Sequence, residues 1–150
     1  MHKLAIVIAL IACSNSSKPT TQAGPVGAPM DLRERITDAD VRAKAPADDK
    51  ATKRELAIDV NGIGAKVVWR TYEVGTAKYI VSAGWEVVTP KPGFTLESLG
   101  HLNPENVGTP EAPVQSEIVR VRWHDNTSSV STSGGEMSVR IAADGQAAKI

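Results

Sequence analysis

The sequence predicts an all-β protein: a small antiparallel β-sandwich or partly open barrel of about six strands, preceded by a flexible N-terminal tether. Three observations support this prediction. From residue 56 onward, apolar residues alternate with polar ones in stretches, as on half-buried strands. The pair Asn61-Gly62 is the strongest short signal of a tight hairpin. All six aromatic residues lie between Trp69 and Trp123, which places the core in that part of the chain.

The first thirteen residues have the parts of an export signal. Met1-His2-Lys3 gives a positively charged start, an apolar run follows over residues 4–11, and the small residue Ala12 precedes the chain's single cysteine, Cys13. The run is too short for a transmembrane helix, which needs about 20 apolar residues. We therefore expect residues 1–12 to be a signal peptide.

The segment Leu10-Ile11-Ala12-Cys13 resembles the lipobox of bacterial lipoproteins. The resemblance implies cleavage before Cys13, a diacylglyceryl thioether on its sulfur, and a fatty-acyl group such as palmitate on its new amino terminus. It also implies export and a lipid anchor in a bacterial membrane, with the domain facing the periplasm or the cell surface. Ser14 stands where an Asp is associated with retention in the inner membrane, so the outer membrane is expected.

Residues 13–52 are predicted to be a lipidated flexible tether and a charged linker. Residues 14–30 are rich in Ser, Thr, Pro and Gly, and a flexible coil of that length spans roughly 20–25 Å. Of the 25 residues from 31 to 55, 14 are charged, seven of each sign. We expect either a weak helix or a disordered linker there. A helix would be capped by Thr37 or Asp38 and ended by Pro46.

Residues 53–150 are predicted to form the β-domain, beginning with a three-stranded meander. An Asn61-Gly62 loop pairs Val60 with Ile63, Ile58 with Ala65 and Leu56 with Val67, which is the register that the apolar residues also predict. A three-residue loop within residues 74–78 then places Thr71 opposite Val81, Trp69 opposite Ala83 and Val67 opposite Trp85. One apolar face would carry Tyr79, Val81, Ala83, Trp85 and Val87.

Residues 89–115 are predicted to be a long loop, because they contain five prolines and three glycines. A short helical turn is expected over residues 95–99, held to the core by Phe94, Leu96 and Leu99. Strands are expected over Ser116–Asp125 and around Met137, Val139 and Ile141. A polar edge strand is expected over Ser128–Ser133, a turn at Asp144-Gly145 and a short terminal strand over residues 146–150.

Composition argues against several functions. The chain balances 17 basic against 17 acidic residues, which argues against nucleic acid as a partner. His101 and His124 lack metal-ligand spacing, so no metal and no cofactor is predicted. His124-Asp125, with serines nearby, is interpreted as a polar turn because adjacent strand residues point to opposite faces. A hydrolase is thus the least supported class, and we expect no enzyme.

One face is a candidate binding surface. Arg120, Arg122, His124 and Arg140 are expected to lie opposite the apolar residues of their strands, whereas the three tryptophans lie on apolar faces and are expected in the core. The leading hypothesis is a non-enzymatic lipoprotein with a structural, assembly or binding accessory role. Its partners would be the membrane, through Cys13, and an envelope protein or an anionic polymer. The alternative is a glycan- or anion-binding surface module that uses the Arg120/Arg122 face and the 89–115 loop.

Overall fold

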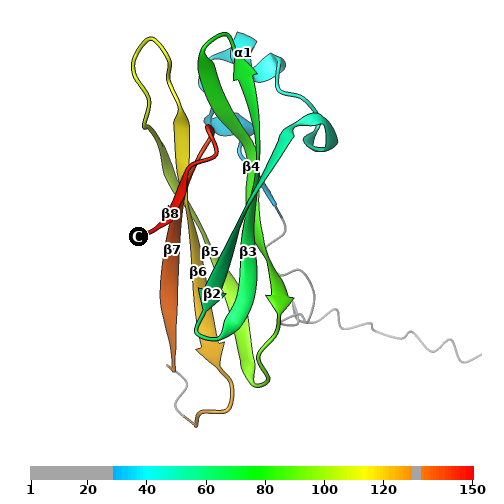
Figure 1. Ribbon diagram of the computed structural model, residues 1–150, viewed down its shortest axis with the longest axis vertical. Helices are drawn as coiled ribbons and strands as arrows, with labels where there is room; N and C mark the ends of the chain where they lie inside the picture. Colours follow the sequence, from blue (N-terminus) through cyan, green and yellow to red (C-terminus); the bar gives the residue numbers. More distant parts are fainter. Residues whose placement is uncertain (1–28, 130–132) are drawn as a thin grey trace, which may run out of the picture.

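The computed structural model describes residues 29–129 and 133–150, and its two antiparallel sheets pack face to face (Figure 1). The predicted β-sandwich is therefore confirmed, and the sheets do not close into a barrel. The first sheet has the strand order β1-β4-β3-β2 and the second has the order β5-β6-β7-β8. The strands are β1 (Met30–Asp31), β2 (Thr52–Val60), β3 (Ile63–Val74), β4 (Ala77–Thr89), β5 (Phe94–Asn106), β6 (Gln115–Asp125), β7 (Gly134–Ala142) and β8 (Ala147–Lys149).

The core lies between the two sheets. Trp69 and Trp85 are buried there among valine, isoleucine and leucine side chains of both sheets, and Trp123 is half-buried at its margin. The Trp69 indole Nε1 donates a hydrogen bond to the Ala142 carbonyl at 2.9 Å, which ties β3 to β7 across the sandwich. The expectation that the tryptophans belong to the core is confirmed, with Trp123 at its edge.

The hairpin of β2 and β3 forms as predicted. Val60 pairs with Ile63, Ile58 with Ala65 and Leu56 with Val67. Asn61 and Gly62 adopt φ angles of 52° and 87°, the left-handed region that a two-residue type I′ turn needs. Turn chemistry and the apolar pattern therefore specify one register together.

The hairpin of β3 and β4 differs from the prediction near its turn. The loop has two residues, Gly75-Thr76, and Thr71 pairs with Ile80 instead of Val81. A register shift between Arg70 and Thr71 then restores the expected pairs of Trp69 with Ala83 and of Val67 with Trp85. The extra residue in β4 is a bulge, and it sends Ile80 into the core between the sheets. Tyr79 and Val81 lie instead in a second cluster with Tyr72.

Residues 30–51, here called the N-terminal strap, cover that second cluster. The strap contains β1, a 3-10 turn at Arg33–Arg35, the helix α1 (Ala39–Ala43) and a 3-10 turn at Asp48–Lys50. The sequence predicts a flexible linker here, but Leu32 and Ile36 are only 1% and 3% exposed. The predicted short helix is confirmed, and its cap is Asp38. The buried side chains of Leu32, Ile36 and Ala51 hold the segment, although half of its residues are charged.

The predicted 89–115 loop is largely a strand. β5 pairs with β6 along Phe94–Asn106, so the expected helical turn at residues 95–99 is wrong. Pro104 lies inside β5 where the register shifts between Leu102 and Glu105, at the edge of the sheet. Edge strands and bulges are where a strand accepts proline. Leu96 is buried in the core, so the first part of this segment belongs to the sandwich.

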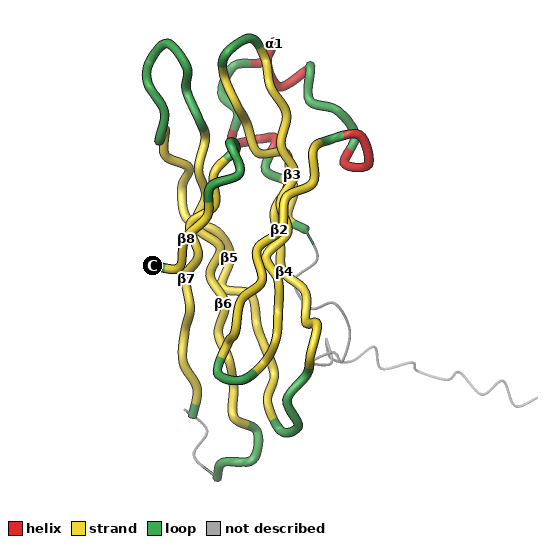
Figure 2. Tube along the Cα trace, in the orientation of Figure 1, coloured by secondary structure: helices red, strands yellow, loops and turns green. Residues whose placement is uncertain are grey.

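The end of the chain matches the prediction in part (Figure 2). β8 pairs with β7 as the expected terminal strand. The polar strand expected over Ser128–Ser133 does not begin at Ser128 or Ser129, which lie in a bend after β6, and residues 130–132 are outside the described residues. The signal peptide, Cys13 and the tether up to residue 28 are also outside them. None of the helices that are described is long and apolar enough to cross a membrane.

Candidate functional site

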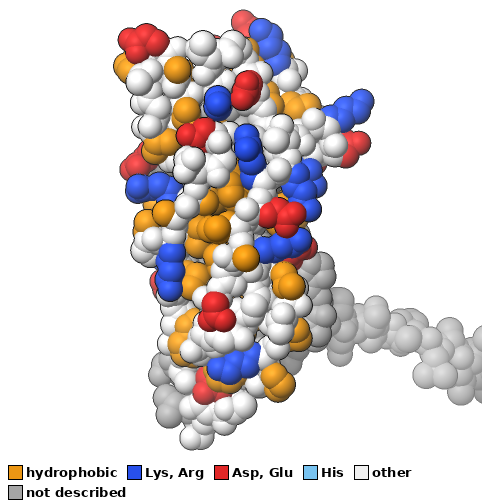
Figure 3. Space-filling view, in the orientation of Figure 1, with side chains coloured by type: hydrophobic (Ala, Val, Ile, Leu, Met, Phe, Trp, Pro, Cys, Tyr) orange, Lys and Arg blue, Asp and Glu red, His pale blue; other side chains and the backbone are white. Residues whose placement is uncertain are grey.

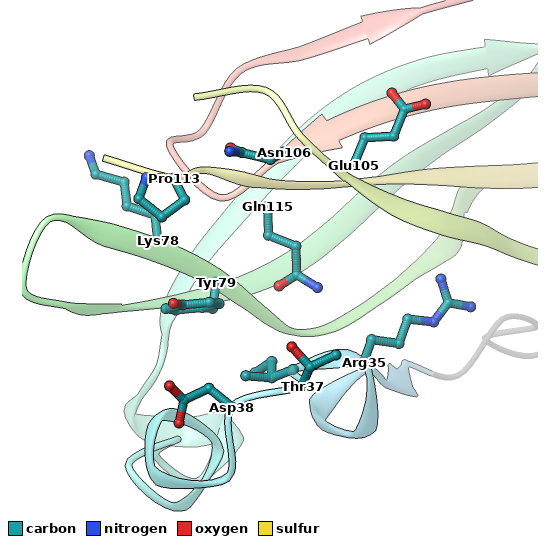
Figure 4. A pocket seen from close by; sticks show the side chains of 10 residues that line it. Arg35, Thr37, Asp38, Lys78, Tyr79, Glu105, Asn106, Pro113 and Gln115 are labelled. Carbon is teal, nitrogen blue, oxygen red and sulfur yellow. The ribbon is translucent and has the colours of Figure 1, made fainter. Parts of the chain in front are cut away.

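A pocket of about 220 Å³ lies where the strap meets both sheets (Figure 4). The strap forms one wall, the beginning of β4 forms another, and the end of β5 with the beginning of β6 completes it. The lining residues are Arg35, Ile36, Thr37, Asp38, Lys78, Tyr79, Glu105, Asn106, Pro113 and Gln115. Two cations and two carboxylates are among them, so the pocket has no strong net charge.

Arg35 connects this pocket to a buried carboxylate. Its Nη1 donates to Glu117 Oε2 at 2.7 Å, and the Glu117 side chain is completely buried. The other carboxylate oxygen, Oε1, is buried and accepts no hydrogen bond from the described residues. An ionised carboxylate loses its hydration on burial, and one ion pair only partly compensates for that loss. Burial therefore raises the pKa of Glu117 to about 7, against the opposing effect of the Arg35 charge.

The sequence interpretation missed Glu117, although a signal was present. Glu117 has the same parity as Val119 and Val121, so alternation places it on the inner face of β6. A charged residue at an inward position needs a partner. The partner, Arg35, lies 82 residues away in a segment expected to be a linker, and no local pattern connects the two.

The pocket offers hydrogen-bond donors. Gln115 Oε1 accepts from the Ile80 N–H at 2.8 Å, and Asn106 Oδ1 accepts from the N–H groups of Gly108 and Val114 at 2.9 Å. These contacts fix which end of each amide is the oxygen. Within the described part of the chain, the two side-chain NH₂ groups donate to no partner. The pocket is therefore suited to a ligand group rich in acceptors, such as a carboxylate or a peptide carbonyl.

The predicted cationic face forms on the outside of β6 and β7, but carboxylates lie within it. Glu136 is 3.4 Å from Arg120 and 2.6 Å from Arg122. Glu97 lies 2.7 Å from His124, and Glu105 lies 3.9 Å from Arg140. The Arg122 guanidinium, hydrogen-bonded to Glu136, lowers the pKa of that carboxyl group. Each of the four predicted site residues thus has an acidic neighbour, and the face is close to neutral.

The two histidines of the β-domain are not brought together. His101 pairs with Val119 and His124 pairs with Thr95, both through β5–β6 pairing. Val119 and His124 are five positions apart on one strand, which corresponds to about 17 Å. Among the described residues, no group of three or more His, Cys, Asp or Glu side chains is arranged to hold a metal ion.

Comparison with known proteins assigns no family to this chain. The chain matches no family model, and neither the curated proteins nor the solved structures include a significant match.

Proposed function

We propose that this chain is a lipid-anchored envelope protein whose β-sandwich serves as a non-enzymatic binding or assembly domain. The N-terminal signal with Cys13 supplies the anchor, and the resemblance to a lipobox favours the outer membrane. Two acyl chains or more give stable anchoring, whereas one gives only marginal binding. The domain would then act next to the membrane, on the periplasmic or the surface side.

The observation that supports this proposal is the strap. It enters the fold directly after the tether sequence and contacts both sheets, through Leu32 in the core and through Arg35 on Glu117. The tether is thereby joined to both sheets of the domain and not to a single strand. The pocket beside the strap adds a binding surface with unused amide donors, which fits a partner protein that presents carboxylates or backbone carbonyls.

A glycan- or anion-binding face at Arg120 and Arg122 is the less supported alternative. Both guanidinium groups share Glu136, and the Glu97 carboxylate lies on the neighbouring strand opposite Arg122. An anionic polymer would have to displace or tolerate these carboxylates, at a cost in electrostatic repulsion.

Intact-mass analysis of the membrane fraction tests the anchor. The chain is expressed in a bacterial host as wild type, as Cys13→Ala and as the matched control Ser14→Ala. We expect the wild type and the control to begin at residue 13 and to carry added acyl mass, and we expect Cys13→Ala to lack it and to leave the membrane fraction. An unmodified, full-length wild-type chain would refute the proposal.

A further inference from the structure

The outer edge of β2 is a free sheet edge. β2 is the last strand in its sheet, and no other described strand pairs with its outer side. A free edge presents unpaired N–H and C=O groups that can form a ladder with another strand. At nine residues, β2 is long enough for such a ladder.

The turn at Asn61-Gly62 decides which residues of β2 direct their backbone N–H and C=O groups away from the sheet. In a two-residue hairpin the flanking pair, here Val60 and Ile63, is hydrogen-bonded, and hydrogen-bonded pairs then recur at every second residue. Even-numbered residues of β2 therefore bond to β3. The N–H and C=O groups of the odd-numbered residues, Lys53, Glu55, Ala57 and Asp59, point away from the sheet.

The inner face of this edge is apolar and incompletely covered. Leu56 and Ile58 pack against the core but remain half-exposed. Figure 3 shows hydrophobic side chains in the middle of the face that carries β2 and β8 in Figure 1. The one inward charge, Arg54, is turned toward the β7–β8 turn, where a Cβ on Gly145 would lie 2.8 Å from its Nη1. The inner surface of this edge is therefore formed mainly by Leu56 and Ile58.

We propose that two copies of this chain associate through antiparallel pairing of their β2 edges, with Leu56 of one copy opposite Leu56 of the other. In this register Lys53 of each copy lies opposite Asp59 of its partner, and Glu55 lies opposite Ala57. Two opposite-charge cross-strand pairs form by symmetry. The two first sheets would become one continuous sheet, in which the two Leu56 side chains oppose each other at the two-fold axis and Ile58 of each copy lies opposite Arg54 of the other.

Charge selects this register over its neighbours. A shift that centres the two-fold axis on Glu55 places the two Glu55 carboxylates directly opposite each other. A shift that centres it on Ala57 places Glu55 opposite Asp59 twice. Like charges directly opposite one another destabilise a strand pair. Of the three registers that use the middle of the edge, only the one centred on Leu56 pairs opposite charges and avoids like ones.

A cysteine scan tests both the association and its register. The full chain carries Cys13→Ser, so that each variant has one thiol: Glu55→Cys, Leu56→Cys or Ala57→Cys. Opposed non-hydrogen-bonded residues have Cα atoms about 4.5 Å apart, within the range of a disulfide. After mild oxidation, we expect the fraction of disulfide-linked dimer to be several-fold higher for Leu56→Cys than for the other two. Position 56 is the least exposed of the three, so accessibility alone would give the opposite order.

Charge reversal provides a second measurement that does not depend on a buried substitution. Lys53→Glu places a negative charge opposite Asp59 and is expected to weaken self-association about tenfold in sedimentation equilibrium. Adding Asp59→Lys restores opposite charges and should restore the association. The Asp59 carboxylate also accepts the Gly62 N–H, so rescue would occur despite the loss of that bond.

The results of the cysteine scan and of the charge reversal are independent of the anchor experiment. Association through β2 goes beyond the proposed function and requires no lipid. Equal disulfide yields at the three positions, a maximum at position 55 or 57, or a wild-type chain that stays monomeric at all concentrations would overturn the proposal. A maximum at position 56 together with rescue by the double reversal would establish it.

Discussion

Arg35 Nη1 lies 2.7 Å from Glu117 Oε2, and this ion pair joins the N-terminal strap to the inner face of the second sheet. The carboxylate is fully buried, while the guanidinium is about one-quarter exposed. The pair therefore determines how firmly the strap is attached, and its effect depends on the charge state of Glu117.

Arg35→Ala is expected to lower the free energy of unfolding by roughly 1–2 kcal/mol at pH 8, because it leaves a buried carboxylate without its cation until that carboxylate takes up a proton. At pH 5, where Glu117 is protonated in the folded state, the loss should be much smaller. Urea unfolding at both pH values measures it. Arg42→Ala, an exposed arginine of the same strap, is the control and should change stability little at either pH. Equal losses for both variants would contradict the role of the pair.

Glu117→Gln should flatten the pH dependence of stability. The pKa of Glu117 is raised from 4.5 to about 7 on folding, so the folded state binds the proton more tightly. The corresponding stability is fully present below about pH 4.5 and is lost as the pH rises through 7, a total of about 3 kcal/mol. Wild type should therefore lose more stability than Glu117→Gln between pH 5 and pH 8. Parallel pH profiles would refute this assignment.

Leu32→Ala should destabilise the whole sandwich, because Leu32 fills the main core although it lies in the strap. The cost expected for deleting a buried leucine is about 3 kcal/mol. Thermal or urea unfolding measures it, and Met30→Ala, two residues earlier and exposed, is the control. A loss no larger than that of the control would show that the strap packs only loosely.

Trp123→Phe should remove most of the fluorescence that acrylamide can quench. Trp69 and Trp85 are buried, whereas Trp123 is half-exposed beside Phe94, with the two ring centroids 6.2 Å apart. The Stern–Volmer slope of the variant should therefore fall well below that of wild type. Trp85→Phe is the matched control and should leave the slope nearly unchanged or increase it, since a shielded emitter is lost.

Glu136→Gln should create the anion-binding face that the sequence suggests. It frees Arg120 and Arg122 from their shared carboxylate, so retention on a sulfated resin should increase. Glu111→Gln changes the total charge equally, at an exposed loop position, and should change retention less. If wild type already binds as strongly as Glu136→Gln, the ion pairs do not neutralise this face.

The parts of the fold that the sequence predicts well are those with two local signals in agreement. At the first hairpin, Asn61-Gly62 fixes the turn and the alternation around Ile58 fixes the face, so the register has one solution. At the second hairpin, Gly75 indicates a turn, but nothing in the sequence indicates the bulge that decides whether Ile80 or Val81 faces the core.

The parts of the fold that the sequence does not predict depend on contacts between distant segments, or on a strand that accepts a residue rarely found in strands. Pro104 indicates a loop in the sequence, yet it lies in β5, an edge strand with an irregular register that can accept proline. Leu32 and Ile36 are too few to predict an amphipathic segment, and their burial depends on surfaces formed by β3 and β4. The same holds for the candidate site: Arg35, Lys78 and Gln115 meet only after the strap folds back onto both sheets.

The strap also has a mechanical consequence. β1 contributes only two residue pairs to the sheet, Met30 with Ala83 and Asp31 with Ser82. Tension applied at Met30 acts first on these pairs, then on Leu32 and Arg35, and only afterwards on the long hairpins of the sandwich. A pull on the N-terminal end of the domain would thus detach the strap before it unravels the sheets. The strap would detach under load while the sheets stay folded, and it would dock again when the load is released.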